Sequence, residues 1–506
     1  MFVKLKSALV VGIDAKLVDV EVDSARGLPS VSVIGLAQGA AKESKDRAIH
    51  TLSNNSVKLP PRKITINLAP ADIKKQGSSF DLPIALGLAR ISGVKMITDG
   101  YLFVSELSLD GKLRSVNGIF PIGVFAKQNN LKLVVSKENE KEGALSGAET
   151  YGFEDFLEVV NFLSGKLEKN PYVLDIGRIQ NNRNSYDVDF SDIKGQVKAK
   201  RAALIAACGF HNMLLVGPPG VGKSMIAKRL PTILSSMDES EMLETTKVYS
   251  VAGMLNDEHP IITQRPFRSP HSTSSDVSMI GGGINASPGE VTLAHNGILF
   301  LDEFPEFKRN VLEVLRQPME DGYITVSRAS AKITYPSKFM LVAAMNPCKC
   351  GYYGSKKKEC SCTIAQIKQY RSKVSGPILD RIDIQVNVYE VDYEEMINDE
   401  ISDSFSSNRM KEIVESVYDI QKKRFRTDNI SYNAQMSEKH LRLYCKLDKA
   451  SNEFLKLAME RFGFSARSYS KILKIARTIA DIEKSETVKP SHIKEAISYR
   501  VLDWDV

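Results

Sequence analysis

The fold of this chain is decided by one stretch, Gly217-Pro218-Pro219-Gly220-Val221-Gly222-Lys223-Ser224. An apolar run, Met213 to Val216, precedes it, and a helical run, Met225 to Leu230, follows it. A strand, a glycine-rich loop and a helix in this order turn backbone N–H groups toward a phosphate. Lys223 then reaches the β- and γ-phosphates, and the Ser224 hydroxyl binds Mg²⁺. Because a chance glycine turn would not keep all eight positions in this context, we expect a nucleotide-binding site here.

Two further apolar runs end in polar residues. Ile298 to Leu301 ends in Asp302 and Glu303, and Phe339 to Met345 ends in Asn346. Ligands of open α/β sheets lie at the carboxyl ends of the strands. We therefore expect Asp302 to hold the water shell of Mg²⁺ and Glu303 to orient and activate the attacking water. Asn346 is placed to hold the water near the γ-phosphate.

The segment Gly376 to Asp383 carries Arg381. An arginine that enters the site of a neighbouring subunit stabilises the charge of the transition state. From the sequence alone, a structural ion pair with Asp380 or Asp383 explains this arginine equally well. Both interpretations remain open at this point.

The composition is that of a globular protein. The 506 residues are 43% hydrophobic and 25% charged, and at roughly 150 residues per domain they predict two to four domains. No apolar run is long enough for a membrane span, and no cleavable apolar segment follows the strand-like Met1 to Lys6. We expect a cytoplasmic protein without a membrane segment. The net charge of +7 favours polyanionic partners.

Four of the six cysteines lie close together, in two C-x-C pairs formed by Cys348, Cys350, Cys360 and Cys362. Four thiolates make a closed tetrahedral site, which suits a structural Zn²⁺ and leaves no open position for catalysis. Cys208 and Cys445 stand alone, and we expect them to be buried, inert thiols.

The segment around these cysteines is basic. From Lys349 to Lys373 it holds seven Lys or Arg and one acid, Glu359, and it includes the run Lys356, Lys357 and Lys358. Tyr352, Tyr353 and Tyr370 lie among the basic residues. This mixture is typical of a surface that binds nucleic acid. The alternative is a zinc site that only stabilises the fold of an insertion.

Residues 1 to about 165 alternate strand-like and helix-like stretches, which predicts a separate α/β domain. The predicted strands are Leu9 to Ile13, Leu17 to Val22, Val31 to Ile34 and Ile64 to Leu68. The predicted helices are Asp81 to Ile91 and Ile119 to Gln128. The polar stretch 166–190 has the composition of a linker.

This N-terminal domain resembles the proteolytic domain of Lon-type proteases in the stretches Lys75 to Ser79, Gly111 to Phe120 and Val134 to Asn139. The resemblance places Ser79 at the nucleophile position and Phe120 at the position of the lysine base. Because a serine nucleophile needs an adjacent base, we expect a Lon-like fold without peptidase activity. Ser78 and Ser79 are then expected to cap the helix that begins at Asp81.

The whole chain resembles the YifB/ComM-type AAA+ ATPases, in the group similar to the magnesium chelatase ATPase subunit. The resemblance is carried by the glycine-rich loop, Ser269 to His271, Pro288 to Gly297, the Asp302-Glu303 strand, Asn346 to Cys348 and Ser375 to Asp383. It implies that Asn346 is sensor 1, Arg381 the arginine finger and Arg467 sensor 2. It also implies a ring, usually a hexamer, with ATP between subunits, and a DNA helicase that drives branch migration during natural transformation.

With this resemblance the predicted fold is a multidomain α/β protein. It consists of a Lon-like domain at 1–165, the linker at 166–190, an AAA+ P-loop NTPase core at 191–395 and a helical lid at 396–506. The zinc-binding insertion occupies 348–362. In the lid, Ser465 is predicted to cap a helix that carries Arg467 in its first turn, and the last helix spans His492 to Val501.

Two insertions in the core bear on the substrate. Residues Gln264 to Glu290 are predicted to be loop-like, with Arg265, Arg268 and a hinge at Gly281 to Gly283. Tyr323 to Tyr335 is predicted to form a hairpin with Arg328 and Lys332 at its tip. In the resembling motors such hairpins point into the ring pore, where basic residues contact phosphates; ordinary solvated charges on an exposed turn are the alternative.

Three functions compete at this stage. The first is an ATP-driven translocase or helicase acting on single-stranded or branched DNA, and the second is a chelatase motor for metal insertion. The third is a scaffold that binds ATP only to assemble, which the full set of catalytic residues disfavours. ATP, Mg²⁺ and a structural Zn²⁺ are the expected cofactors.

Overall fold

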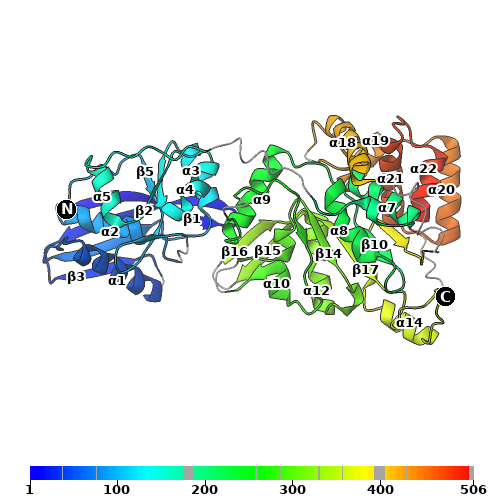
Figure 1. Ribbon diagram of the computed structural model, residues 1–506, viewed down its shortest axis with the longest axis horizontal. Helices are drawn as coiled ribbons and strands as arrows, with labels where there is room; N and C mark the ends of the chain where they lie inside the picture. The colour runs from blue at the N-terminus through cyan, green and yellow to red at the C-terminus, as the bar shows by residue number, and fades with distance from the viewer. Residues whose placement is uncertain are drawn as a thin grey trace.

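The computed structural model describes residues 1–36, 38–73, 75, 77–174, 186–256, 260–283, 287–328, 331–355, 357–391, 405–428 and 430–500. They form an N-terminal α/β part, a central α/β core and a set of C-terminal helices, which follow one another along the long axis of the molecule (Figure 1). No helix in these ranges is both long and apolar enough to cross a membrane.

The N-terminal part contains a seven-stranded sheet in the order β3-β4-β2-β1-β5-β8-β9. Its strands are β1 (Phe2–Val11), β2 (Asp14–Ala25), β3 (Ser30–Ile34), β4 (Lys63–Ala69), β5 (Tyr101–Phe103), β8 (Lys132–Ser136) and β9 (Thr150–Phe153). In β1, Val3 and Leu5 are buried while Lys4 and Lys6 are exposed. This alternation is typical of a strand with one buried face.

Helices cover this sheet: α1 (Gln38–Asn54), α2 (Asp81–Ile91), α3 (Ile119–Gln128), α4 (Glu140–Leu145) and α5 (Phe156–Leu163). The buried helix α2 lies directly on β1 and β2. A Cβ at its Gly87 would stand 2.5 Å from Cγ2 of Val22, so only glycine permits this close approach. A small ribbon, β6 (Glu106–Leu107) and β7 (Leu113–Arg114), lies beside α2.

Two predictions for this part are wrong in detail. The strand expected at Leu9 to Ile13 is the end of β1, because Gly12 has a φ of +69° and turns the chain into β2. The serines do not cap α2: its N-cap is Phe80 without a side-chain bond, and the Ser78 hydroxyl donates to the Glu106 carboxylate. The first turn of α2 instead holds Asp81, which accepts from Arg47 Nε at 2.6 Å and suits the positive helix start.

The core contains a parallel five-stranded sheet in the order β11-β14-β17-β10-β18. Its strands are β10 (Met213–Val216), β11 (Phe267–Arg268), β14 (Ile298–Leu301), β17 (Met340–Met345) and β18 (Ile384–Asn387). All residues of β10, β14 and β17 are buried. Parallel strands covered on both faces have this uninterrupted apolar pattern.

The two faces of the core sheet belong to different apolar clusters. Met340, Val342 and Ala344 of β17 pack with α7 (Val197–Gly209) and α8 (Lys223–Ile233). The alternate residues Leu341, Ala343 and Met345 pack on the other side. The elements on that side are α10 (Asp276–Ile280), α11 (Glu290–Leu293), α12 (Arg309–Val314) and α15 (Gly376–Leu379).

The remaining core elements flank these layers. They are α9 (Glu239–Val251), α13 (Arg316–Asp321), α14 (Ile364–Arg371), the pair β12 (Gly281–Gly282) with β13 (Ser287–Pro288), and the hairpin β15 (Tyr323–Arg328) with β16 (Ala331–Pro336). The region Gln264 to Glu290 is more ordered than the predicted loop, since it contains β11 and α10. Its Arg265 is buried and donates to Glu241 at 2.8 Å, so this arginine serves the core and not a substrate.

The C-terminal helices are α18 (Ser407–Arg424), α19 (Glu438–Tyr444), α20 (Lys449–Phe462), α21 (Ala466–Ile482) and α22 (Pro490–Ser498). Their apolar side chains are continuous with one face of the core sheet. Ser465 is the N-cap of α21, as predicted, and accepts from the Ser468 N–H. The predicted last helix begins and ends earlier, at α22, and residues 501–506 lie outside the described residues.

The N-terminal part meets the core at α3 and α9 (Figure 1). The Ser250 hydroxyl of α9 donates to Glu142 at 2.6 Å, and the backbone N–H of Phe120 donates to the same carboxylate at 3.0 Å. Burial is the main cause that raises the pKa of Glu142. Phe120 itself is fully buried. The start of α3 therefore forms a contact between the N-terminal part and the core. We call this contact of Phe120, Glu142 and Ser250 the joint.

Candidate functional site

The glycine-rich loop joins β10 to α8 and leaves its backbone open toward the helix start. Gly220 and Gly222 have φ values of +81° and +93°, which glycine adopts without strain. No neighbouring atom would touch a Cβ at either position. The first helical residue is Lys223, so α8 directs its free N–H groups and its positive dipole end into the loop.

Lys223 lies folded into this loop. Its ammonium donates to the carbonyls of Gly217 and Pro218, both at 2.7 Å, and to Asn346 Oδ1 at 3.1 Å. Burial lowers the pKa of Lys223 to about 8, although the Asp302 carboxylate opposes the shift. A buried cation held by carbonyl oxygens is matched in charge to a triphosphate.

Ser224 and Asp302 meet directly. The Ser224 hydroxyl donates to Asp302 Oδ2 at 2.6 Å, which brings together the hydroxyl and the carboxylate that Mg²⁺ would require. Glu303 follows in a left-handed conformation with a φ of +51°, and its side chain is exposed. Such backbone strain in a residue other than glycine is concentrated at functional sites.

The order of strands in the sheet explains this convergence. β14, β17 and β10 are adjacent and parallel, so Asp302, Asn346 and the start of the glycine-rich loop emerge at the same edge. The structure thus brings Lys223, Ser224, Asp302 and Asn346 into one hydrogen-bonded set. These contacts fit a site for a nucleotide with Mg²⁺.

The two predicted arginines lie away from this set. Arg381 pairs with Glu320 of α13 and not with Asp380 or Asp383, so the alternative interpretation has the wrong partners. Asp383 is instead paired with Lys471 at 2.6 Å. Arg467 lies in the first turn of α21, is exposed, and makes no hydrogen bond or ion pair with the described residues.

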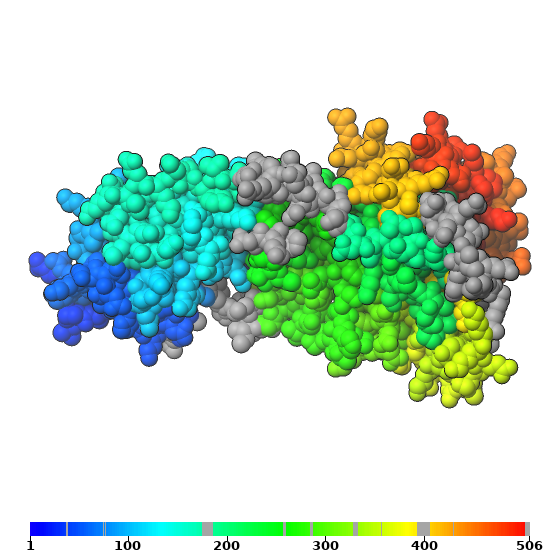
Figure 2. Space-filling model, in the orientation of Figure 1, coloured from blue at the N-terminus to red at the C-terminus, as the bar shows by residue number. Residues whose placement is uncertain are grey.

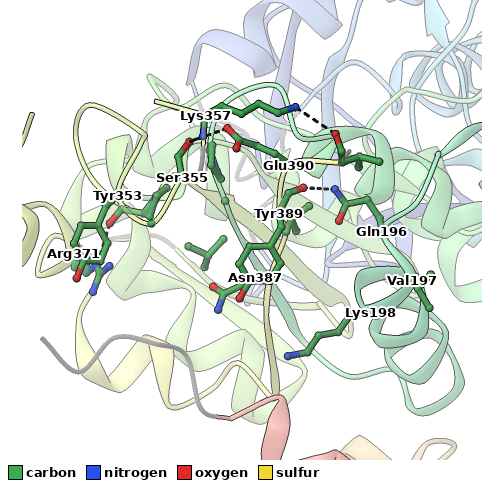
Figure 3. Close-up of a pocket in the computed structure, with 17 residues that line it drawn as sticks. Gln196, Val197, Lys198, Tyr353, Ser355, Lys357, Arg371, Asn387, Tyr389 and Glu390 are labelled. Atoms are coloured by element: carbon green, nitrogen blue, oxygen red, sulfur yellow. Dashed lines mark hydrogen bonds between the residues drawn. The ribbon is translucent and has the colours of Figure 1, made fainter. Parts of the chain in front are cut away.

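A pocket of about 630 Å³ borders the outer side of the glycine-rich loop (Figure 3). Gln196 stands at its edge and donates to the Tyr389 carbonyl at 2.6 Å. Across the pocket, Tyr353 lies beside Arg371, whose guanidinium is 5.2 Å from the ring centre. Nothing in the sequence signals this pocket, because Tyr353, Gly354 and Ser355 on one wall lie before α14 and belong to no strand or helix.

The four clustered cysteines lie with their sulfur atoms within 4.8 Å of one another. The separations are 3.3 Å for Cys348 and Cys350, 3.4 Å for Cys350 and Cys360, and 3.6 Å for Cys348 and Cys360. Burial alone would raise the pKa of Cys350, but the Tyr352 N–H and the Cys348 thiol lower it to about 5. A thiolate is the form that binds metal.

The cysteine cluster is attached to the nucleotide-binding edge. Cys348 follows Asn346 after one proline, and a Cβ at Gly351 would stand 2.9 Å from Pro219 of the glycine-rich loop. The surrounding lobe, with α14, projects from a corner of the molecule (Figure 2). Cys208 and Cys445 are buried free thiols, as predicted, and burial raises the pKa of both.

The predicted nucleic-acid contacts are in part outside the described residues. The structure does not describe Lys356 or the side chain of Arg328, which lies at the end of β15. Lys332 is exposed on β16. Lys357 donates to the Val391 carbonyl at 3.3 Å, and Lys358 lies 4.4 Å from the ring centre of Tyr352. No described contact joins these lysines into one surface.

Three protein families match the chain. Residues 189–396 match "Magnesium chelatase, subunit ChlI", residues 20–139 match "Subunit ChlI of Mg-chelatase", and residues 404–500 match "Magnesium chelatase, subunit ChlI C-terminal". The central match contains all the residues of the hydrogen-bonded set described above.

Similar proteins match over nearly their full length. The chain is 41% identical to "Competence protein ComM" of Haemophilus influenzae over 97% of this chain and 96% of that protein. It is 39% identical to "Uncharacterized protein YifB" of Escherichia coli over the same shares. The match to the "Magnesium-chelatase 38 kDa subunit" of Rhodobacter capsulatus is 27% identical and covers 31% of this chain and 50% of that protein.

Proposed function

The chain belongs to the YifB/ComM-type family of magnesium-chelatase-like AAA+ proteins, and we propose that it is an ATP-driven ring motor that moves DNA. The proposal is carried by one observation, the hydrogen-bonded set of Lys223, Ser224, Asp302 and Asn346 at the edge of the core sheet. By its likeness to ComM, the motor acts on single-stranded or branched DNA. It then promotes branch migration in recombination during natural transformation.

Each residue of the site has a separate task in the proposed ATP hydrolysis. Lys223 leaves the loop carbonyls and donates to the β- and γ-phosphate oxygens, while the backbone N–H groups of Gly217 to Ser224 hold the phosphate chain. Ser224 and Asp302 hold Mg²⁺, which neutralises charge on the phosphates. Glu303 accepts a hydrogen bond from the attacking water, and Asn346 holds that water in line.

We propose that the remaining groups act between subunits of a hexameric ring. Arg381 reaches the γ-phosphate of a neighbour, where its guanidinium stabilises the transition-state charge. Residues 396–506 serve as the lid, and its exposed Arg467 is available as a sensor of the γ-phosphate. Residues 1–165 form a Lon-like domain without peptidase activity, 166–190 the linker and 191–395 the AAA+ core, in a cytoplasmic protein.

The four cysteines are proposed to hold one structural Zn²⁺. Ligands about 2.3 Å from a tetrahedral ion lie about 3.8 Å apart, close to the 3.3–3.6 Å between three of the sulfur atoms. The lobe then keeps a fixed shape beside Pro219. Elemental analysis of protein purified without chelator should find one zinc per chain. Protein without metal, with all four thiols freely titratable, would reject the site.

The DNA contacts are proposed for two places. Arg328 and Lys332 of the hairpin contact the backbone in the ring pore. The Lys356 to Lys358 run of the zinc-binding lobe contributes to initial binding. Contacts of this kind release counterions, so affinity falls steeply with salt and depends little on sequence.

DNA-stimulated ATPase and branch migration of a four-way junction test this function. Arg328→Ala with Lys332→Ala should keep basal ATPase but lose most of the stimulation and strand movement. Lys6→Ala with Lys16→Ala removes the same charge from exposed positions of the N-terminal sheet and is the matched control. If DNA neither binds at low salt nor raises the ATPase rate, the DNA motor is rejected. A chelatase-like metal-insertion motor is then favoured if ATP is hydrolysed, and an ATP-gated scaffold if it is not.

A further inference from the structure

The main chain around Arg381 is fixed from two sides. Asn212 Nδ2 donates to the Arg381 carbonyl at 3.1 Å. Two residues later, the Asp383 carboxylate accepts from Lys471 of α21 at 2.6 Å, and little of either side chain is exposed. Because these bonds tie the segment to β10 and to the C-terminal helices, a change of partner at Arg381 involves its side chain alone.

That side chain is held inside its own subunit. Arg381 Nη1 donates to the Pro377 carbonyl at 2.7 Å, and Nη2 pairs with the carboxylate of Glu320. Arg381 Nε is buried and meets no hydrogen-bond partner among the described residues. Only 11% of the arginine side chain is exposed, against 53% of the glutamate side chain. Among the residues that the structure describes, Glu320 is therefore the one anionic partner of the guanidinium, which leaves it to reach another anion.

Glu320 lies where α13 leads into the hairpin of β15 and β16. It lies in the last turn of α13, and Gly322, with a φ of +70°, leads directly into β15 of the hairpin. The hairpin reaches the N-terminal part: Ile13 packs against its cluster of Ile324, Val326 and Tyr335. A Cβ at Gly12 would stand 3.1 Å from the Thr334 carbonyl. Figure 1 shows the hairpin between the core and the N-terminal sheet.

We propose that Glu320 is a positioning residue that competes with the γ-phosphate of the neighbouring subunit for Arg381. The inference rests on the proposed role of Arg381 between subunits. While the neighbour lacks a triphosphate, Glu320 keeps the guanidinium in its own subunit. When a triphosphate draws Arg381 away, Glu320 loses its partner, and the end of α13 and the hairpin behind it are released. Occupancy of one nucleotide site is thereby coupled to the hairpin of the next subunit.

The test is the steady-state ATPase of Glu320→Gln, which keeps the shape and removes the competing charge. Competition affects bound ATP and the transition state alike, so KM for ATP should fall about two- to fivefold, the range that one exposed ion pair supports, with kcat little changed. Stimulation by DNA should shrink. Glu313→Gln, which removes a nearby carboxylate that pairs with Arg316 and not with Arg381, is the matched control.

Two results separate this inference from the proposed function. If Arg381→Ala keeps full ATPase, the role of Arg381 between subunits is wrong. If Arg381→Ala loses activity while Glu320→Gln leaves KM unchanged, or lowers kcat at unchanged KM, the competition is wrong and the motor stands. In the Arg381→Ala background Glu320→Gln should no longer change the affinity for a non-hydrolysable ATP analogue, which is measured without turnover. If Glu320→Gln does not fold, Glu320→Ala, which also removes the competing charge, should show the same fall in KM, and an unchanged KM there overturns the inference.

Discussion

The N-terminal part and the core each place a serine beside the start of a helix, with opposite surroundings. Ser79 precedes α2 in the N-terminal part, and the residue expected from the sequence at the position of a base is Phe120, which is fully buried in the joint with α9. In the core, Ser224 lies in the first turn of α8 and donates to Asp302 at 2.6 Å. Among the described residues no side-chain hydrogen bond of Ser79 is present, whereas Ser224 is part of a hydrogen-bonded set.

A buried lysine does not make the difference, because both parts have one bound to main-chain carbonyls. Lys75 donates to the Ile73 carbonyl at 3.1 Å, as Lys223 does to Gly217 at 2.7 Å. What separates them is that Asn346 accepts from Lys223, and Asp302 from the neighbouring Ser224, at the ends of adjacent parallel strands. A usable site therefore requires several elements to converge, which one motif cannot provide.

The largest effect is expected when the hydrolytic residue of the core is removed. Glu303→Gln should keep ATP binding and lower the rate of hydrolysis about 10²–10⁴-fold, the range of a positioned base. Phosphate release, with binding of a fluorescent ATP analogue, measures both properties. Glu306→Gln, which removes a nearby exposed carboxylate paired with Lys373, is the control and should retain the rate. Undiminished turnover in Glu303→Gln would show that another group of the core activates the water and that the assignment of Glu303 is wrong.

The second effect is a pH dependence that distinguishes Lys223. Its pKa is lowered to about 8 by burial, and phosphate oxygens beside it would raise the pKa again. Binding of ATP must then take up a proton above pH 8, so affinity should fall about tenfold per pH unit from there. Below pH 8, Lys223 is protonated in both the free and the ATP-bound protein. It therefore makes no contribution to the pH dependence of ATP affinity in that range.

Calorimetric titration with a non-hydrolysable ATP analogue at pH 7.5, 8.5 and 9.5 measures this slope. Buffers of different ionisation enthalpy report the uptake of the proton directly. Lys223→Arg keeps its charge throughout this range and should give a flat profile. Parallel profiles for the two proteins would mean that Lys223 is already charged in the empty loop at pH 9.5.

Local pattern explains which parts of the fold could be predicted. β10 is a short apolar run before the glycine-rich loop, and β14 and β17 are short apolar runs that end in polar residues. Because α21 begins at a serine cap, it too is encoded within a few neighbouring residues. The family resemblance implied that Asn346 is sensor 1, whereas its hydrogen bond with Lys223, 123 residues away, is known from the structure.

Contacts between distant segments explain what could not be predicted. Glu320 lies 61 residues before Arg381, and nothing around either residue signals the pair. The cap predicted from Ser78 failed for the same reason, since Glu106, 28 residues later, takes its hydroxyl. A local propensity is overridden when a tertiary partner offers a charged acceptor.

A smaller effect is expected at the joint between the two parts. Ser250→Ala removes the hydroxyl that donates to the buried Glu142, while the Phe120 N–H and the Asn139 amide still donate to this carboxylate. The free energy of unfolding should fall by about 1–2 kcal/mol. Chemical denaturation measures it, with Ser498→Ala, whose hydroxyl bonds within α22, as the control. Equal midpoints for both variants would mean that α3 does not use this joint.

The smallest effect, and the sharpest form of the comparison, is expected at Ser79. Proton transfer from a serine needs a base within hydrogen-bond reach, and Phe120 offers only a buried ring and a backbone N–H already bonded to Glu142. The neighbouring Ser78 hydroxyl is committed to Glu106. Ser79→Ala should therefore leave casein and peptide substrates as intact as the parent protein does, with the ATPase rate unchanged. If the parent protein cleaves these substrates and Ser79→Ala does not, a group other than Phe120 must act as the base. Both serines would then belong to active sites, and the contrast between them would be lost.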